Sequence, residues 1–327
     1  MSGNKGALVS RAQTVPLSVA MCTYNGAAHL EAQLESIAEQ SLPPDELVVC
    51  DDGSTDETLQ LVRKFSEAAP FTVRILTGLG RLGVVRNFER ALSHVAGKYV
   101  ALADQDDEWK PNRLESGMRA MKQAEAASGM HCPILVHSDM HVVDSKGAQI
   151  DTSFFDRRGF RKRHPKPLRE LVLQNYVTGC STLVNRALLD LALPFPATIS
   201  IHDLWLALIA AAAGTVVTLD EQTVRYRSHG KNVIGAKRVE WRPYARVDSA
   251  LELFRRALGD TKAVEQRLLE RGIHGPNIEF LQEYHRKATA GGVGAALSLS
   301  ADGVRLQNAF PTLIYYLHVL MGWLAVK

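Results

Sequence analysis

Acidic side chains gather where two apolar runs end. Asp104, Asp106 and Asp107 lie in "ADQDD", directly after "KYVAL", and Asp51 and Asp52 follow "DELVVC" in the same way. In an extended chain, residues two apart point to one side, so Asp104 and Asp106 face together and Asp107 faces away. Two such carboxylates repel unless a cation lies between them, and Mg²⁺ or Mn²⁺ takes oxygen ligands along with substrate phosphates. The pattern predicts a metal and diphosphate site; the alternative is a solvated loop in which Asp107 caps the next helix.

A further acidic residue, Asp203, opens an apolar helix in "ISIHDLW". Aspartate is a favoured helix N-cap, which is one explanation of its position. The other is a general base, because His202 precedes it and Trp205 follows it as an aromatic platform for a sugar ring. From these residues alone, both interpretations stay open.

Basic side chains follow in "YRSHGKN", where Arg227, His229 and Lys231 share a short loop. This composition suits an anionic leaving group or a metal ion. The alternative is an ordinary polar turn.

The segment "DDGSTDE" has a partial structural explanation. Ser54 and Glu57 have the Ser-x-x-Glu spacing of a capping box, which predicts the start of the following helix. Asp52 lies ahead of that cap, and the capping box does not explain its position. We therefore expect its carboxylate to accept hydrogen bonds from a base or a ribose.

"GLGRLG" matches the Gly-x-Gly-x-x-Gly pattern of dinucleotide-binding proteins and lies between an expected strand and helix. Two strand-helix units precede it, whereas that fingerprint usually belongs to the first strand. The carboxylate expected about 20 residues later, Asp104, also sits in an acidic cluster. A dehydrogenase is therefore disfavoured.

Strands and helices that alternate from Val15 onward must position these side chains. Apolar runs at 16–22, 45–50, 71–76 and 98–103 read as strands, and helical periodicity appears at 27–41, 56–69 and 84–96. Such alternation predicts a mostly parallel sheet flanked by helices, with ligands at the carboxyl ends of its strands. Further on, the sequence predicts a helix at 111–126, a strand pair at 133–150 with a turn at 144–147, and a charged helical stretch at about 239–290.

Composition excludes several classes of protein. The 327 residues are 46% hydrophobic and carry a net charge of +3, which gives no reason to expect nucleic-acid binding. Four scattered cysteines fit reduced thiols in a cytoplasm, and the N-terminus lacks the apolar core of a signal peptide. We expect residues 1–14 to be loose.

Two segments bear on membranes. The apolar stretch at about 309–326 sits at the margin of the about 20 residues that a spanning helix needs, so a last core helix, a membrane-surface helix and a true span all remain open. The basic segment 157–166 is too polar for a core element and is either a solvated loop or a contact for anionic lipid or a lipid-linked diphosphate.

Taken in order, "VAMCTYNG", "LVVCDDGSTDET", "ALADQDDEWKPNRL", "NYVTGCSTLVNRALL", "ISIHDLWLALIAAAAG" and "YRSHGKN" resemble the family-2 glycosyltransferases. Within the family, "DQDD", "HDLW" and "YRSHGKN" are most similar to bacterial rhamnosyltransferases of surface-polysaccharide assembly. The resemblance implies the GT-A fold over residues 15–235, with a nucleotide-binding half at 15–127, an acceptor half at 128–235 and a helical C-terminal region at 236–327.

The resemblance also implies roles for particular residues. Contacts to the base, ribose and diphosphate of a nucleotide-sugar are expected from Thr23, Tyr24, Asn25, Asp52, Arg86, Asp104, Gln105 and Asp106. Asp106 would also hold Mg²⁺ or Mn²⁺, with His229 as a further ligand. Asp203 matches the catalytic base, and His202, which stands where the family more often has Glu, and Trp205 would contact the acceptor.

The implied activity is inverting transfer of a sugar, L-rhamnose from dTDP-rhamnose, to a hydroxyl of a glycan or a polyprenyl-diphosphate-linked glycan at the cytoplasmic face of the membrane. Another hexose donor, dTDP- or UDP-linked, and a non-catalytic nucleotide-sugar-binding protein remain as alternatives. A nucleotidyltransferase is disfavoured because "CTYNGAAHL" lacks a glycine-rich basic loop for a triphosphate.

Overall fold

The computed structural model describes residues 17–228 and 247–324, and nine strands of this part form one sheet. The expected loose segment 1–14 lies outside these ranges. The strands are β1 (Leu17–Thr23), β2 (Glu46–Asp51), β3 (Thr72–Leu76), β4 (Tyr99–Asp104), β5 (Glu108–Trp109), β6 (Ile134–Val143), β7 (Gln149–Asp151), β8 (Leu183–Asn185) and β9 (Thr215–Arg227).

The sheet has the order β3-β2-β1-β4-β8-β6-β9-β5, and β7 pairs with β6. Strands β1 to β4 are mutually parallel, as the alternating pattern predicts. Strand β8 runs antiparallel to β4, which makes the second half of the sheet mixed. Because β2 and β4 flank β1 on opposite sides, the carboxyl ends of β1 and β4 form a switch point, the place where open α/β sheets bind ligands.

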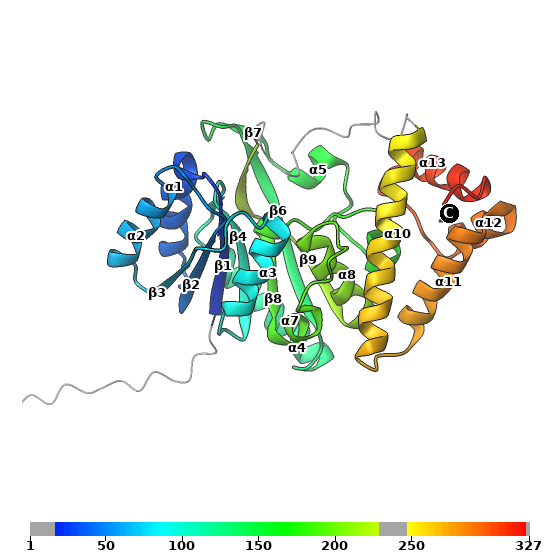
Figure 1. The fold of residues 1–327 in the computed structure, drawn as a ribbon, viewed down its shortest axis with the longest axis horizontal. Helices are drawn as coiled ribbons and strands as arrows, with labels where there is room; N and C mark the ends of the chain where they lie inside the picture. Colours follow the sequence, from blue (N-terminus) through cyan, green and yellow to red (C-terminus); the bar gives the residue numbers. More distant parts are fainter. Residues whose placement is uncertain (1–16, 229–246, 325–327) are drawn as a thin grey trace, which may run out of the picture.

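Helices cover the sheet and extend beyond it. The first group is α1 (Ala27–Ala38), α2 (Thr58–Ala68), α3 (Val84–His94), α4 (Arg113–Ser128), α5 (Phe154–Arg158), α6 (Pro167–Leu171), the 3₁₀ turn η1 (Gly179–Ser181), α7 (Arg186–Ala192) and α8 (His202–Ala213). The second group is α10 (Val247–Glu270), α11 (Pro276–Ala290), α12 (Gly292–Ala301) and α13 (Ala309–Leu320). The second group lies at the end of the molecule opposite α1 and α2, with α10 packed against α7 and α8 (Figure 1).

Apolar side chains set these positions. All seven residues of β1 are buried, as expected for a strand covered on both faces. Helix α1 buries Leu30, Leu34 and Ile37, the three side chains with helical spacing. Helix α3 buries Phe88, Ala91 and Leu92 and packs on β1 and β2. The polar ends of the strands are thereby held on a rigid frame.

The basic segment 157–166 forms no helix or strand beyond the end of α5, as expected. One of its side chains nevertheless joins the core, because Phe160 packs beside the buried Phe154 and Phe155 of α5. Its cations also have partners: Arg161 pairs with Glu170, and Lys162 pairs with Asp156.

Helix α13 packs against α10, α11 and α12 and buries Tyr315, His318 and Val319. In the described part of the chain, no helix has both the length and the apolar character needed to cross a membrane. Yet α12, α13 and the turn after them expose an apolar set, which we call the C-terminal apolar face: Val293, Leu297, Phe310, Leu313, Leu317, Leu320, Met321 and Trp323.

Candidate active site

A cleft of about 1020 Å³ opens at the carboxyl ends of β1 and β4. Tyr24, Asp52 and Asp104 line it from the parallel half of the sheet. Gly179 and Asp203 line it from η1 and from the start of α8. The cleft therefore brings together residues that the sequence places in both expected halves.

The turn after β1 is fixed from several sides. Thr23 is buried and donates its hydroxyl to Asp51 Oδ1 at 2.8 Å. The Gln105 side chain accepts from the Tyr24 N–H at 2.8 Å and donates to the Tyr24 carbonyl at 3.0 Å. A β-carbon on Gly26 would lie 2.1 Å from Gln105 Oε1, so this approach requires glycine. Asn25 adopts φ 47°, and its side-chain oxygen accepts from the Thr55 N–H.

Asp51 and Asp52 hold neighbouring loops. Asp51 accepts from Ser54 Oγ and from the Ser54 N–H, and helix α2 starts only at Thr58 without a side-chain cap from Glu57. The capping-box prediction is therefore wrong. Asp52 lines the cleft while it accepts from the N–H groups of Leu82 and Gly83, so its carboxylate shapes the loop after β3.

That loop, the "GLGRLG" segment, supplies Arg81 rather than Arg86. The Arg81 guanidinium carbon lies 4.2 Å from the centroid of the Tyr24 ring, and both residues line the cleft. Arg86 instead pairs with Glu89 and donates to the carbonyls of Phe195 and Pro196. The structure thus contradicts the diphosphate contact expected of Arg86, because the register of α3 turns its side chain away from the cleft.

The segment that we call the aspartate turn, Asp104 to Glu108, leaves β4 and bends into β5. Asp104, Gln105 and Asp106 line the cleft. The prediction that Asp107 caps a helix is wrong: Asp107 is fully buried and accepts from the Arg227 N–H at 2.9 Å. The Cys180 sulfur and a carboxylate oxygen from each of Asp104 and Asp107 lie within 4.8 Å of one another.

Burial raises the pKa of Asp104 well above its usual range, and the charges of Asp107, Asp106 and Asp203 raise it further. Burial, reinforced by the Asp106 charge, also raises the pKa of Asp107. One nearby cation is Arg113, which donates to the carbonyls of Leu102 and Cys180 and packs over the Trp109 ring at 3.5 Å. Burial lowers the pKa of Arg113 to about 9.

A divalent cation suits this turn. Asp104 and Asp106 both line the cleft, and neighbouring carboxylates add to burial in raising the pKa of Asp104, a repulsion that a cation would relieve. Hard cations prefer such oxygen ligands and complete their shell with phosphate and water. Asp107 and Cys180 are buried and do not line the cleft.

Asp203 lies in the first turn of α8, where three donors hold its carboxylate. Asn175 Nδ2 donates at 2.9 Å, the Gly179 N–H at 3.2 Å and the Leu204 N–H at 2.6 Å. Asn175 Oδ1 accepts from the Val177 N–H at 3.0 Å, which fixes the amide so that its NH₂ faces Asp203. Burial raises the pKa of Asp203 to about 6, against the lowering effect of the three donors. This pKa suits a general base near neutral pH.

The side chains of His202 and Trp205 lie in different surroundings. His202 lines the cleft, stacks on Phe88 with ring centroids 3.9 Å apart, and has no hydrogen-bond partner for either ring nitrogen among the described residues. Burial lowers its pKa to about 3, so the ring is neutral, and both of its nitrogens are buried. Trp205 is 1% exposed and donates its indole N–H to the Ala192 carbonyl, so the expected sugar platform is wrong. Its place in α8 points it into the core.

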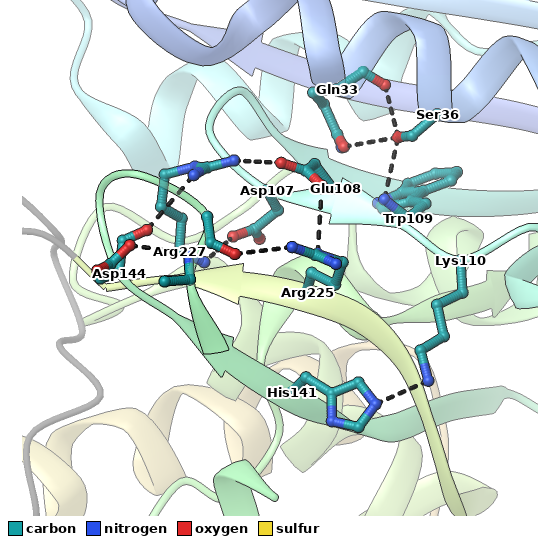
Figure 2. Close-up of polar contacts among 12 residues, drawn as sticks. Gln33, Ser36, Asp107, Glu108, Trp109, Lys110, His141, Asp144, Arg225 and Arg227 are labelled. Carbon is teal, nitrogen blue, oxygen red and sulfur yellow. Dashed lines mark hydrogen bonds and ion pairs between the residues drawn. The ribbon is translucent and has the colours of Figure 1, made fainter. Parts of the chain in front are cut away.

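The "YRSHGKN" loop is described only to Ser228, and the predicted metal ligand His229 lies outside the described residues. Arg227 is 4% exposed and binds the aspartate turn rather than facing the cleft (Figure 2). Arg227 therefore does not face a ligand in the cleft, and its anionic partner is the Glu108 carboxylate. Burial beside acidic residues fixes its guanidinium inside the protein.

Sequence reasoning missed Arg81, Asn175 and Arg113. Arg81 lies within "GLGRLG", a pattern that is defined by its glycines and says nothing about the residue between them. Asn175 is 28 residues from Asp203, and Arg113 is 67 residues from Cys180, so neither contact has a local signal.

Comparisons with known proteins agree with this geometry. The family model described as glycosyl transferase family 2 matches residues 18–189, just over half of the chain. The chain belongs to glycosyl transferase family 2. It is accordingly a transferase, and the expected enzyme class is confirmed.

Relatives carry names of the same kind. The chain is 26% identical to dTDP-rhamnosyl transferase RfbG of Shigella flexneri over 66% of this chain and 74% of that protein. It is 26% identical to an uncharacterized glycosyltransferase of Nostoc over 66% of each chain. It is 32% identical to an Escherichia coli UDP-Glc:alpha-D-GlcNAc-diphosphoundecaprenol beta-1,3-glucosyltransferase over 32% of this chain and 40% of that one. The match thus spans less than two thirds of the length of some relatives.

Solved structures share the fold. S. aureus TarS 1-349 in complex with UDP superposes with a TM-score of 0.51 at 20% identity, covering 78% of this chain and 70% of that one. The mannosyltransferase PcManGT of Pyrobaculum calidifontis, in complex with GDP-Man and Mn²⁺, has a TM-score of 0.50 at 18% identity, covering 94% and 85%. The expected α/β fold with a helical C-terminal region is confirmed.

Proposed function

We propose that this transferase moves a sugar, with inversion, from a dTDP- or UDP-linked donor to a hydroxyl of a glycan or lipid-linked glycan in bacterial surface-polysaccharide synthesis. The observation that carries the proposal is the cleft that Asp104 and Asp106 share with Asp203. L-Rhamnose is the proposed sugar, since one relative is named a dTDP-rhamnosyl transferase. Another hexose is the alternative, because a further relative's name specifies UDP-Glc.

In this mechanism Asp203 takes the proton of the acceptor hydroxyl as that oxygen attacks the anomeric carbon. Its three donors hold the carboxylate in one orientation, and its pKa of about 6 keeps it ionised at neutral pH. His202, whose neutral ring lines the cleft, is assigned to the acceptor side. Asp104 and Asp106 would hold Mg²⁺ or Mn²⁺, which supplies charge stabilisation for the departing diphosphate.

The donor side uses the parallel half of the sheet. Tyr24, beneath Arg81, is proposed to face the base, and the fixed loop of Thr23 and Asn25 lines the same end of the cleft. Asp52 contributes by holding the loop that carries Arg81. Residues 15–127 would thus serve the donor and 128–235 the acceptor.

A thermal-shift screen of the full chain with Mn²⁺ tests the donor. Binding of a nucleotide-sugar at about 100 times its Kd contributes about 2.7 kcal/mol and raises the melting temperature by several degrees. We expect dTDP-rhamnose to stabilise the protein and GDP-mannose to leave it unchanged. Stabilisation by UDP-glucose alone would replace the rhamnosyl proposal, and no response to any nucleotide-sugar would contradict donor binding.

We also propose that the C-terminal apolar face rests on a membrane surface, where a lipid-linked acceptor would be presented. Its support is the run of exposed Leu313, Leu317 and Leu320 on α13, beside the aromatic Trp323. Flotation with anionic vesicles tests it: Leu313→Glu with Leu317→Glu should abolish co-flotation. The matched control is Met130→Glu, because Met130 is 63% exposed outside that face. Equal flotation of both variants would contradict the proposal.

A further inference from the structure

Arg227, the last residue of β9, joins three segments that are far apart in sequence. Its Nε donates to the Asp106 carbonyl at 2.8 Å, and its own N–H donates to Asp107 Oδ1 at 2.9 Å. One Nη donates to the Asp144 carbonyl at 3.4 Å, and the other binds the Glu108 carboxylate. Figure 2 shows the guanidinium between the aspartate turn and the turn after β6.

This contact pattern uses the shape of arginine and not only its charge. A guanidinium presents N–H groups in a planar fork, so one side chain reaches several acceptors in fixed directions. Here the acceptors are two backbone carbonyls and one carboxylate. A lysine ammonium at the end of a flexible stem would keep the charge but not these directions.

These contacts of Arg227 restrain Asp106. Its side chain lines the cleft, whereas its carbonyl is held from behind by Arg227. The neighbouring Asp107 side chain is held by the same residue. The Asp106 carbonyl and the Asp107 side chain are thus both tied to β9, which restricts movement of the backbone that carries the Asp106 carboxylate. Ser228, next in the chain, is fixed by its N–H to the Val143 carbonyl at 2.8 Å.

We propose that Arg227 is a positioning residue that sets the Asp106 carboxylate for a divalent cation and a nucleoside diphosphate. This inference rests on the proposed function, since it concerns the same site. Arg227 does not itself line the cleft, so it acts through the aspartate turn. Partners that orient metal ligands in this way are worth about 10- to 100-fold in metal affinity or activity.

Calorimetry with UDP and dTDP as probes, in Mn²⁺ and in EDTA, tests the inference without turnover. For Arg227→Gln we expect an affinity loss of about 10- to 100-fold in Mn²⁺ and less than about threefold in EDTA. Arg227→Lys should remain within about threefold of Arg227→Gln, since charge alone does not restore the fork. The matched control is Arg225→Gln: Arg225 lies on the same strand and pairs with Glu108, but binds neither Asp106 nor Asp107.

Several outcomes would overturn the inference. Wild-type affinity in Mn²⁺ for a folded Arg227→Gln protein would do so, as would full recovery in Arg227→Lys or an equal loss in Arg225→Gln. If Arg227→Gln does not fold, Glu108→Gln decides, because its carboxylate is 28% exposed and lies on the aspartate turn. The nucleotide affinity of Glu108→Gln should fall at least about threefold in Mn²⁺ and not in EDTA. An unchanged affinity in Mn²⁺ would overturn the inference. Wild-type protein that binds neither probe in Mn²⁺ would instead remove the proposed function, and this inference with it.

Discussion

Asp203 and Asp104 line one cleft, but their surroundings differ. Asp203 accepts hydrogen bonds from three N–H donors, which lower its pKa. Burial is the only influence that raises this pKa, and the net value is about 6. Asp104 lies among other carboxylates, so burial and three neighbouring charges act in the same direction on its pKa. Donors around a carboxylate fix it and keep it ionised, whereas like charges around it call for a cation. The same residue type is thereby prepared for two tasks.

The largest effect is expected at Asp203. Asp203→Asn keeps the size of the side chain but removes the proton acceptor, so sugar transfer should fall about 10²- to 10⁴-fold while calorimetry shows nucleotide binding near that of the wild type. In the wild type, kcat/KM should rise with pH through about 6, because the carboxylate must be ionised to act.

The matched control for that variant is Asp260→Asn. Asp260 is also a buried carboxylate, but it accepts from the Ser200 N–H and does not line the cleft. Transfer retained by Asp203→Asn, or lost equally in both variants, would remove Asp203 from the role of base.

The second largest effect is expected at Asp106, which lies in the carboxylate cluster around Asp104. Asp106→Ala should lower the Mn²⁺-dependent affinity for a nucleoside diphosphate by about 100-fold. The loss should be at least as large as that caused by removing a residue that only orients a metal ligand, because Asp106 is the proposed ligand itself. Binding in EDTA should change little. Calorimetry in both buffers measures this, and an equal loss with and without Mn²⁺ would show that Asp106 serves the nucleotide and not the metal.

The sequence predicted some parts of this contrast better than others. Strands β1 to β4 and the position of Asp104 and Asp106 beyond a strand end follow from local patterns, because apolar runs and parallel topology bring strand ends to one edge. The role of Asp203 was implied only by the family resemblance, since it opens a helix and could equally have been an N-cap. The roles of Asp107 and Trp205 were predicted wrongly, since both are decided by burial. Asp107 lies 120 residues from Arg227, whose N–H it accepts, and no local periodicity reports such a contact.

A smaller effect is expected at Asn175, which orients Asp203. Asn175→Ala removes one donor to the ionised carboxylate, and such hydrogen bonds contribute about 1.5 to 3 kcal/mol, so the pKa of Asp203 should rise by about one unit or more. The acid limb of kcat/KM would then move to higher pH, with a loss of about fivefold or more at pH 6. Asn277→Ala is the control, because its amide donates to the Ala212 carbonyl outside the cleft. An unshifted pH profile would show that Asn175 only supports the fold.

The smallest effect should appear at Arg81, on the proposed donor side of the cleft. Its guanidinium lies over the Tyr24 ring but is exposed, and cation–π contacts at exposed sites contribute about 0.5 to 1 kcal/mol. Arg81→Ala should therefore weaken nucleotide binding about two- to fivefold, in Mn²⁺ and in EDTA alike, because the contact concerns the base end of the cleft. A loss seen in Mn²⁺ alone would instead place Arg81 with the aspartate turn and the diphosphate.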